Sequence, residues 1–490
     1  MQTINLLKAA DIETSLIAGL DSSFSVVCDS RLIKPGDLFV AIPNKQTLAH
    51  VNDAIRAGAK IVVAEELICS RLKQEYKEVS FIPSPTPRLV FSKMVSALYH
   101  NQQPKTIVAV TGTNGKSSTV NMLFQFWNLT HLKAAALGTL GLTLSPDLQK
   151  KIKLNLPNLT SLGPVEFHQA LNALKAEDIN HLAIEASSHG LDQYRHHGAE
   201  IEAAAFTNLT QDHLDYHPTM EEYFKAKAKL FTEILPVGKT AVLNADSSYF
   251  ERLHSLCIER KQKVLTYGLT EKADLYAKNI QQIGHGVEFD LVIQGESFLK
   301  QRLNLAGQFQ LENLLCAMAL GLSTGLTKDI LVENISSIKS IKGRMEFVGF
   351  KNNAPIFVDF AHTPDALECA LKNLRPHTKG NLWVVFGCGG NRDAVKRPLM
   401  GQIAEKFADK VIVTDDNPRF EEPAIIRQMI LEACTTAKEV GSRGEAIAVA
   451  IAGLKEDDVL LIAGKGHESG QIVGDIILPF SDQDEVLKHI

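Results

Sequence analysis

The feature that most constrains this chain is an apolar run that leads directly into a glycine-containing loop and then a helical pattern. The run covers residues 107–110, and the loop reads T-G-T-N-G-K-S-S over residues 111–118. Glycines let backbone N–H groups close around phosphate oxygens, and a helix N-terminus adds a positive dipole end. We therefore predict a phosphate-binding loop. Its residues would be Gly112, Thr113, Asn114, Gly115, Lys116, Ser117 and Ser118.

Two of these side chains have specific expected roles. Lys116 would neutralise the β- and γ-phosphates of a nucleotide, and Ser117 would bind Mg²⁺. The general spacing G-x-x-x-x-G-K-[ST] is not met, because Val110 stands where the first glycine would be. The alternative is an ordinary strand-to-helix turn. The agreement of strand, glycines, Lys-Ser pair and helix favours phosphate binding.

The length and the pattern of apolar runs predict the fold class. A chain of 490 residues exceeds what one hydrophobic core usually supports. Short apolar runs alternate with helical patterns, which predicts βαβ units and mostly parallel sheets. The runs lie at 37–42, 60–64, 182–184, 203–206, 241–243, 356–360, 382–386, 411–413 and 459–463. We predict three α/β domains: a small one at 1–102, a central P-loop-type domain at 103–340, and a doubly wound, Rossmann-like domain at 341–490.

Charge and cysteine usage exclude several classes of protein. The net charge of −5 offers no basic field for nucleic acid or an anionic membrane. No apolar stretch approaches the roughly 18 residues of a membrane span, and no signal peptide is visible. The seven cysteines are scattered and form no C-x-x-C pair, which fits a reducing compartment. We expect a cytoplasmic, monomeric protein that acts on small molecules.

Polar residues follow further strands of the predicted central domain. Glu185 ends one apolar run, and residues 208–217, with His213 and His217, follow another. A strand-end carboxylate near bound phosphate is well placed for Mg²⁺, which prefers oxygen ligands. Alternatively, Glu185 caps a helix and the histidines are structural. The histidines could also bind zinc, although Leu214 stands where an H-E-x-x-H motif has glutamate.

These motifs resemble those of the Mur ligase and folylpolyglutamate synthetase superfamily. The similar segments are the loop T-G-T-N-G-K-S, E-A-S-S-H-G-L from residue 185 and D-H-L-D-Y-H from residue 212. The resemblance implies that Glu185 and His213 hold a Mg²⁺ that bridges ATP and the substrate carboxylate. The pattern Y-x-x-A-K-x-x-L-F from residue 223 implies a carbamate on Lys227, rather than on Lys225 or Lys229.

The third predicted domain extends the resemblance to the nucleotide. Residues 304–313 resemble the family's G-x-F-N-x-x-N segment, which implies that Asn313 approaches adenine. Residues 343–346 and 359–364 resemble the hinge and nucleotide face of that domain. By this resemblance Arg344 would meet phosphate and Asp359 the ribose.

Polar clusters at three further strand ends predict a cleft that carries both signs of charge, which suits a zwitterion. They lie at 387–393, 415–419 and 464–468. Within MurE-type Mur ligases, D-N-P-R is the signature of enzymes that add meso-diaminopimelate, and lysine-adding relatives lack its arginine. The implied contacts are Arg392, Asp416, Asn417, Arg419, Gly464 and Glu468.

The first domain resembles the MurE-type domain that holds the UDP end of a nucleotide-sugar substrate. The resemblance implies contacts from Ser30, Thr160, Ser161, Ser187 and Arg195. It implies an ATP-dependent ligase of peptidoglycan precursor synthesis that joins meso-diaminopimelate to the D-Glu side-chain carboxylate of UDP-MurNAc-L-Ala-D-Glu through an acyl phosphate. Its alternatives are an L-lysine-adding homologue, a folylpolyglutamate-type ligase, and a P-loop ATPase or regulator that only hydrolyses nucleotide.

Overall fold

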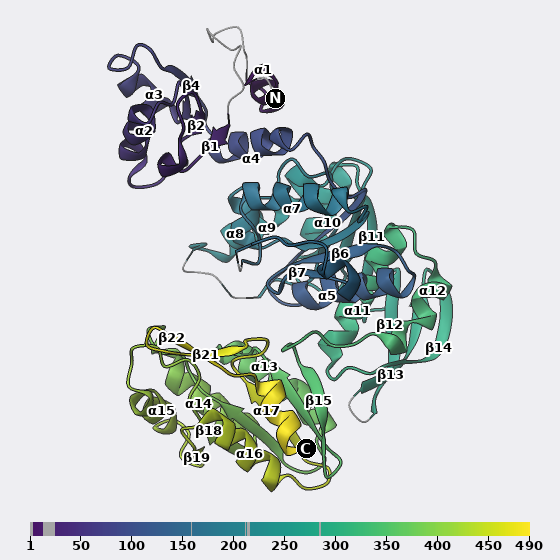
Figure 1. Cartoon of the computed structure of the whole chain (residues 1–490). Helices are drawn as coiled ribbons and strands as arrows, with labels where there is room; N and C mark the ends of the chain where they lie inside the picture. Colours follow the sequence, from purple (N-terminus) through teal and green to yellow (C-terminus); the bar gives the residue numbers. More distant parts are fainter. Residues whose placement is uncertain (1–2, 13–24, 158, 211, 213–215, 284–285) are drawn as a thin grey trace. The chain divides into compact units, whose positions relative to one another are not determined.

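The structure is a computed structural model that describes residues 3–12, 25–157, 159–210, 212, 216–283 and 286–490. The chain divides into two compact units, Met1–Thr266 with Cys316–Leu326, and Tyr267–Leu315 with Thr327–Ile490. Figure 1 labels many of their helices and strands. No helix in the described part of the chain is long and apolar enough to cross a membrane.

A four-stranded parallel sheet, in the order β1-β2-β3-β4, begins the first unit. Apolar cores fill both of its faces, one including Leu6 and Met94 and the other Val51 and Leu72. Strands covered on both faces read as continuous apolar runs, which is why β2 and β3 could be predicted. The elements are α1 (Thr3–Ala9), β1 (Val26–Val27), η2 (Ser30–Leu32), β2 (Leu38–Val40), α2 (Thr47–Arg56), β3 (Ile61–Ala64), α3 (Glu66–Leu72), β4 (Ser80–Pro83) and α4 (Pro87–Leu98).

The central strands follow the order β11-β10-β9-β5-β8-β6-β7, and β7 is antiparallel to β6. Strand β5 is buried and pairs in parallel with β8 and β9, so their carboxyl ends share one edge. The elements are β5 (Thr106–Thr111), α5 (Lys116–Leu129), β6 (Ala134–Gly138), β7 (Gly141–Leu144), α6 (Pro146–Gln149), α7 (Pro164–Ala176), β8 (His181–Glu185), α8 (Ser188–Asp192), β9 (Ala203–Phe206), α9 (Met220–Lys229), η3 (Leu230–Ile234), β10 (Thr240–Asn244), α10 (Phe250–Glu259) and β11 (Lys263–Gly268).

The second unit contains an antiparallel meander, β12-β13-β14, and a six-stranded sheet in the order β15-β16-β20-β17-β18-β19. Within the six-stranded sheet only β15 is antiparallel to its neighbour. The elements that follow β11 along the chain are β12 (Leu275–Ile283), β13 (Gly286–Ile293), β14 (Glu296–Leu303), α11 (Gln308–Ser323), which is divided between the two units, α12 (Lys328–Glu333), η4 (Ile335–Ser337), β15 (Glu346–Lys351), β16 (Ala354–Asp359), α13 (Pro364–Leu374), η5 (Arg375–His377), β17 (Leu382–Phe386), α14 (Lys396–Phe407), β18 (Lys410–Val413), α15 (Pro423–Leu431), β19 (Lys438–Glu439), α16 (Arg443–Gly453), β20 (Val459–Ala463), β21 (Gly470–Val473), β22 (Ile476–Pro479) and α17 (Asp482–His489).

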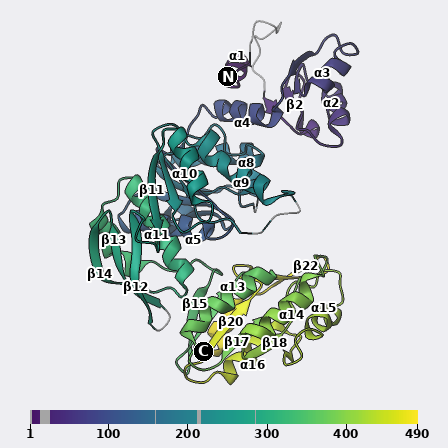
Figure 2. The same cartoon turned by 180° about the vertical axis from the view of Figure 1, so that it is seen from behind.

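Helices cover both faces of the six-stranded sheet, with α13 and α14 on one face and α16 on the other (Figure 2). Two separate apolar cores fill these faces, one including Leu371 and Met400 and the other including Ile447. The predicted mixed α/β fold with parallel-rich sheets is confirmed. The domain boundaries at residues 102 and 340 stay a prediction.

Candidate active site

The predicted phosphate loop has a backbone shape that depends on its two glycines. Gly115 adopts φ 85° as the N-cap of α5, and Gly112 has φ 148°. Both values lie where residues with a Cβ are strained. A Cβ at Gly112 would also lie 1.8 Å from Oγ1 of Thr207, so no side chain fits there. The sequence interpretation of a glycine-dependent turn agrees with this geometry.

The segment after β9 braces the phosphate loop through hydrogen bonds. The Asn114 N–H donates to Oδ1 of Asn208 at 2.9 Å, and the Thr113 N–H donates to the Asn208 carbonyl at 2.9 Å. The Thr207 hydroxyl donates to the Asn114 carbonyl at 2.6 Å. These contacts fix the loop before any ligand binds, which lowers the cost of ordering it around phosphate.

Lys116 folds back over its own loop in this structure. Its Nζ donates to the carbonyls of Gly112 at 3.0 Å and Thr113 at 2.7 Å. A phosphate would therefore compete with two carbonyl oxygens for the ammonium group. Ser118 is buried in the first turn of α5, whereas Ser117 directs its hydroxyl toward another strand end.

That second strand end carries Glu185, the last residue of β8. Its Oε1 accepts hydrogen bonds from the Ser117 hydroxyl at 2.8 Å and the Thr139 N–H at 2.9 Å. Its Oε2 accepts from the Thr139 hydroxyl at 3.2 Å. The alternative role of Glu185 as a helix cap is wrong, because Ser187 caps α8 by accepting from the Gly190 N–H.

The oxygen atoms of Ser117 and Glu185 are suitable ligands for a magnesium ion. The Ser117 hydroxyl and the Glu185 carboxylate place oxygen ligands side by side, and Mg²⁺ prefers oxygen ligands with several waters or phosphate oxygens. Among the described residues, no three His, Cys, Asp or Glu side chains lie close enough to form a metal site by themselves. The predicted ligand His213 lies outside the described residues. His217 is buried, with its ring centroid 5.2 Å from that of Tyr223.

Lys227 is buried against the phosphate loop. Its side chain is 1% exposed, and Nζ donates to the Gly112 carbonyl at 2.7 Å. Nζ also lies 4.6 Å from the centroid of the Tyr223 ring. Burial lowers the pKa of Lys227 well below its ordinary value, and the positive charge of Lys116 lowers it further. Burial disfavours the charged form of a lysine, and the neutral amine is its nucleophilic form.

The two neighbouring lysines occupy different environments. Lys225 is exposed and lies 3.5 Å from Glu221. Lys229 pairs with Asp192 at 3.0 Å, which raises the pKa of Lys229 although burial opposes it. Of the three lysines that the sequence left open, only Lys227 contacts the phosphate loop, which favours it as the modified residue.

Four residues predicted to contact the nucleotide-sugar gather beside Glu185. The Ser161 hydroxyl accepts from the Ser187 N–H at 3.0 Å, and Arg195 donates to the Ser161 carbonyl at 2.7 Å. The hydroxyls of Thr160 and Thr139 lie 3.0 Å apart. The fifth, Ser30, begins η2 in the first sheet region. The assigned contacts of all five stay predictions.

In the second unit, Asp359 ends β16 and accepts hydrogen bonds from the backbone N–H groups of Met345 at 2.6 Å and Ala361 at 2.8 Å. Burial raises the pKa of Asp359, and the nearby charge of Arg344 opposes that rise. The Arg344 guanidinium lies 4.8 Å from the centroid of the Phe360 ring. Asn313 is buried on α11. Their contacts with nucleotide stay predictions.

The predicted amino-acid pocket contains a compact polar cluster. Oε2 of Glu468 accepts from Asn417 Nδ2 and from Lys465 Nζ, each at 2.9 Å. Lys465 also donates to Oδ1 of Asn417 at 2.9 Å. Burial opposes ionisation of Glu468, but these hydrogen bonds and the charge of Lys465 lower its pKa overall. Lys465 was not among the predicted contacts, although it lies inside the motif at 464–468.

Arg419 adopts the left-handed region, with φ 52°. Its backbone N–H donates to the Ile472 carbonyl at 3.0 Å, and Nη1 donates to the Gly390 carbonyl at 2.9 Å. A Cβ at Gly464 would lie 2.7 Å from Oδ2 of Asp416, so glycine lets that carboxylate approach. The cluster thus brings together the predicted residues Asp416, Asn417, Arg419, Gly464 and Glu468.

Arg392 is the exception among the six predicted contacts. It is exposed in the segment between β17 and α14, and none of the polar contacts of the cluster includes it. Its role stays a prediction.

Comparison with known proteins identifies the class to which this fold and these strand-end motifs belong. Residues 110–321 match the Mur ligase middle domain, and residues 343–466 match the Mur ligase, glutamate ligase domain. The chain belongs to the Mur ligase family.

Individual relatives and solved structures show which members of the family this chain is similar to. A UDP-N-acetylmuramoyl-L-alanyl-D-glutamate–2,6-diaminopimelate ligase of Rhizobium meliloti is 42% identical over 469 residues, 95% of this chain and 93% of the relative. A solved structure of a ligase with the same name is 32% identical, with a TM-score of 0.74 over 100% of this chain and 99% of that one. The MurF ligase of Thermotoga maritima, solved with ADP, is 17% identical, with a TM-score of 0.57 over 95% of this chain and 96% of that one, and indicates the fold alone.

Proposed function

We propose that this protein is an ATP-dependent ligase that adds meso-2,6-diaminopimelate to the D-Glu side-chain carboxylate of UDP-MurNAc-L-Ala-D-Glu. The observation that carries the proposal is the position of Arg419 beside the Asn417–Lys465–Glu468 cluster. This arrangement offers a guanidinium for a carboxylate and a carboxylate for an ammonium group. The full-length similarity to ligases of that name supports the same substrate.

The proposed reaction has two steps, phosphoryl transfer to a carboxylate and attack of an amine on the acyl phosphate. The D-Glu carboxylate attacks the γ-phosphoryl group of ATP and ADP leaves. The diaminopimelate amine then attacks the acyl phosphate, an amide forms, and phosphate departs. Lys116 stabilises charge on the transferring phosphoryl group. Ser117 and Glu185, with His213, would hold Mg²⁺, which supplies further charge neutralisation when bound. Thr160, Ser161, Ser187 and Arg195 would hold the nucleotide-sugar.

Lys227 is proposed to react with CO₂, so that its neutral amine becomes a carbamate and a proton is released. The buried position and lowered pKa of Lys227 support this step, because only the unprotonated amine reacts. The proposal further includes a cytoplasmic location and a monomeric state.

Release of ADP tests the proposed function. We expect sustained release of ADP over many turnovers to require UDP-MurNAc-L-Ala-D-Glu and meso-diaminopimelate together, because the acyl phosphate is consumed only when the amine attacks it. ADP release from ATP alone at the same rate would instead favour a nucleotide hydrolase. Release supported by a folate and glutamate would favour a folylpolyglutamate-type ligase.

Arg419→Ala is expected to raise the KM for meso-diaminopimelate by some tens to thousands of fold. Arg419 is half-buried, and the pair that it would form with the amino acid is buried once the pocket is occupied. Loss of one member of such a pair costs about 2–5 kcal/mol. Arg419→Lys should recover only part of this loss, because an ammonium group cannot pair with a carboxylate at two points. Steady-state kinetics with varied amino acid measures both variants, and an unchanged KM in Arg419→Ala would remove Arg419 from the pocket.

A further inference from the structure

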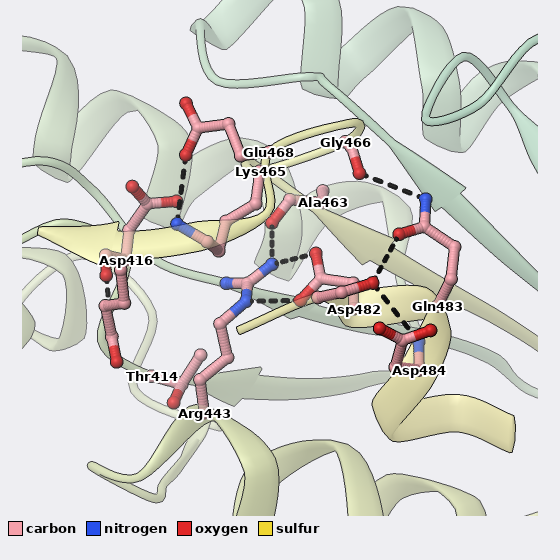
Figure 3. Close-up of polar contacts among 12 residues, drawn as sticks. Thr414, Asp416, Arg443, Ala463, Lys465, Gly466, Glu468, Asp482, Gln483 and Asp484 are labelled. Carbon is pink, nitrogen blue, oxygen red and sulfur yellow. Dashed lines mark hydrogen bonds and ion pairs between the residues drawn. The ribbon is translucent and has the colours of Figure 1, made fainter. Parts of the chain in front are cut away.

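A fully buried ion pair adjoins the amino-acid cluster (Figure 3). Nε of Arg443 donates to Oδ1 of Asp482 and Nη2 donates to Oδ2, each at 2.7 Å. Both side chains are 0% exposed. Arg443 begins α16 and Asp482 begins α17, so the pair joins two helices at the edge of the sheet where the pocket lies.

The pair also supports the turn that carries Gly464 and Glu468. Nη2 of Arg443 donates at 3.0 Å to the carbonyl of Ala463, the last residue of β20. Gln483, which follows Asp482, donates at 3.1 Å to the carbonyl of Gly466. The two contacts hold the backbone at the start and in the middle of the turn, on opposite sides of Lys465.

The positive charge of Arg443 acts on Asp416 as well as on Asp482. Asp416 is buried, and its carboxylate lies against Gly464, where a Cβ would come within 2.7 Å of Oδ2. Burial raises the pKa of Asp416, while Arg443 from α16 and Lys465 from the turn oppose that rise. Glu468 and Asp482 also face Asp416 and raise its pKa. His362 and Cys388, from the segments after β16 and β17, face it as well.

Arg443 retains hydrogen-bonding capacity on the third nitrogen of its guanidinium. Nη1 is buried and has no hydrogen-bond partner among the described residues. Three acidic side chains, Asp416, Glu468 and Asp482, gather with two basic ones, Arg443 and Lys465. An ammonium group bound beside Asp416 would be a third basic partner.

We infer that Arg443, fixed by Asp482, is a positioning residue of the amino-acid pocket. It holds the 464–468 turn through the Ala463 carbonyl and places a positive charge near the buried Asp416, which would receive an ammonium group of the amino acid. The inference rests on the proposed function, because it gives Arg443 a positioning role in the proposed amino-acid pocket. Arg443 acts through the turn and Asp416 and does not itself touch the substrate.

The pH dependence of kcat/KM for meso-diaminopimelate tests this inference. Arg443→Gln removes a cation, so the pKa of Asp416 should rise and the acid limb of the profile should move up by about one pH unit. Below that limb the KM for the amino acid should rise about tenfold, while the KM for ATP stays unchanged. Asp482→Asn removes an anion, so it should move the limb in the opposite direction.

Two further variants keep the test decisive. Arg375 is a matched control: it pairs with Asp409 before the start of β18, away from the 415–419 segment that follows this strand, so Arg375→Gln should leave the limb in place. If Arg443→Gln does not fold, Arg443→Gln with Asp482→Asn removes both charges. The double variant also loses the hydrogen bond from Arg443 to the Ala463 carbonyl, so the KM for meso-diaminopimelate should rise while the KM for ATP stays unchanged.

The outcomes separate the inference from the function on which it rests. Opposite shifts for the two single variants support the positioning role. Active wild-type enzyme with an unmoved limb in folded Arg443→Gln, or with an unchanged KM for meso-diaminopimelate in the folded double variant, would overturn that role alone. Wild-type protein without diaminopimelate-dependent ADP release would instead overturn the proposed function.

Discussion

Lys227→Ala should be almost inactive as a ligase, with activity at least about 100-fold below wild type, while the protein stays folded. Loss of a group that supports a metal site typically costs up to about 100-fold, and this change also removes the proposed carbamate anion. The side chain is buried and donates to the Gly112 carbonyl, so its loss also frees the phosphate loop at that point. Initial rates of ADP release measure the effect, and a thermal melt measures folding.

The neighbouring lysine provides the matched control for this variant. Lys225 is exposed beside Glu221, so Lys225→Ala should retain nearly full activity. Short carboxylates added to Lys227→Ala should restore part of the rate by supplying an anion in the cavity. An inactive Lys225→Ala beside an active Lys227→Ala would show that the modified lysine has been assigned in the wrong register.

Lys116→Ala is expected to lower kcat by at least about 10²–10³-fold, the usual cost of removing one stabilising donor from a transition state. Its Nζ lies over the phosphate loop, bound to two backbone carbonyls that a γ-phosphate would replace. The exposed Lys133, paired with Asp178, is the control, and Lys133→Ala should behave as wild type. Near-normal turnover by folded Lys116→Ala would contradict the role of the loop.

Local sequence patterns were sufficient to predict the parts of the candidate site that directly follow buried strands. Residues 111–118 predicted the loop because glycine, lysine and serine have few other reasons to follow an apolar strand in that order. Glu185 could be expected near bound phosphate because it follows a strand of the same predicted parallel sheet, and ligands lie at the carboxyl ends of such strands. The structure adds that β5 and β8 are direct neighbours. The hydrogen bond between the side chains of Ser117 and Glu185 agrees with that expectation.

Contacts between distant residues could not be predicted from local patterns. Arg443 and Asp482 lie 39 residues apart, and each alone resembles an ordinary charged residue at a helix start. Their pairing depends on the packing of α16 and α17, which periodicity does not specify. Lys465 could have been found, because it lies between two glycines in a motif that was already recognised. The choice among Lys225, Lys227 and Lys229 needed burial, which only the fold supplies.

The most direct test of the proposed function compares kcat/KM for meso-diaminopimelate and L-lysine with the same UDP-MurNAc-L-Ala-D-Glu preparation. L-Lysine lacks the second carboxylate, so Arg419 would lose its partner in the pocket. An unpaired buried charge costs about 2–5 kcal/mol, which corresponds to discrimination of at least about 30-fold. We expect meso-diaminopimelate to be preferred by that margin or more, with the amide product confirmed by mass. Equal values for the two amino acids, or a preference for L-lysine, would contradict the proposed substrate.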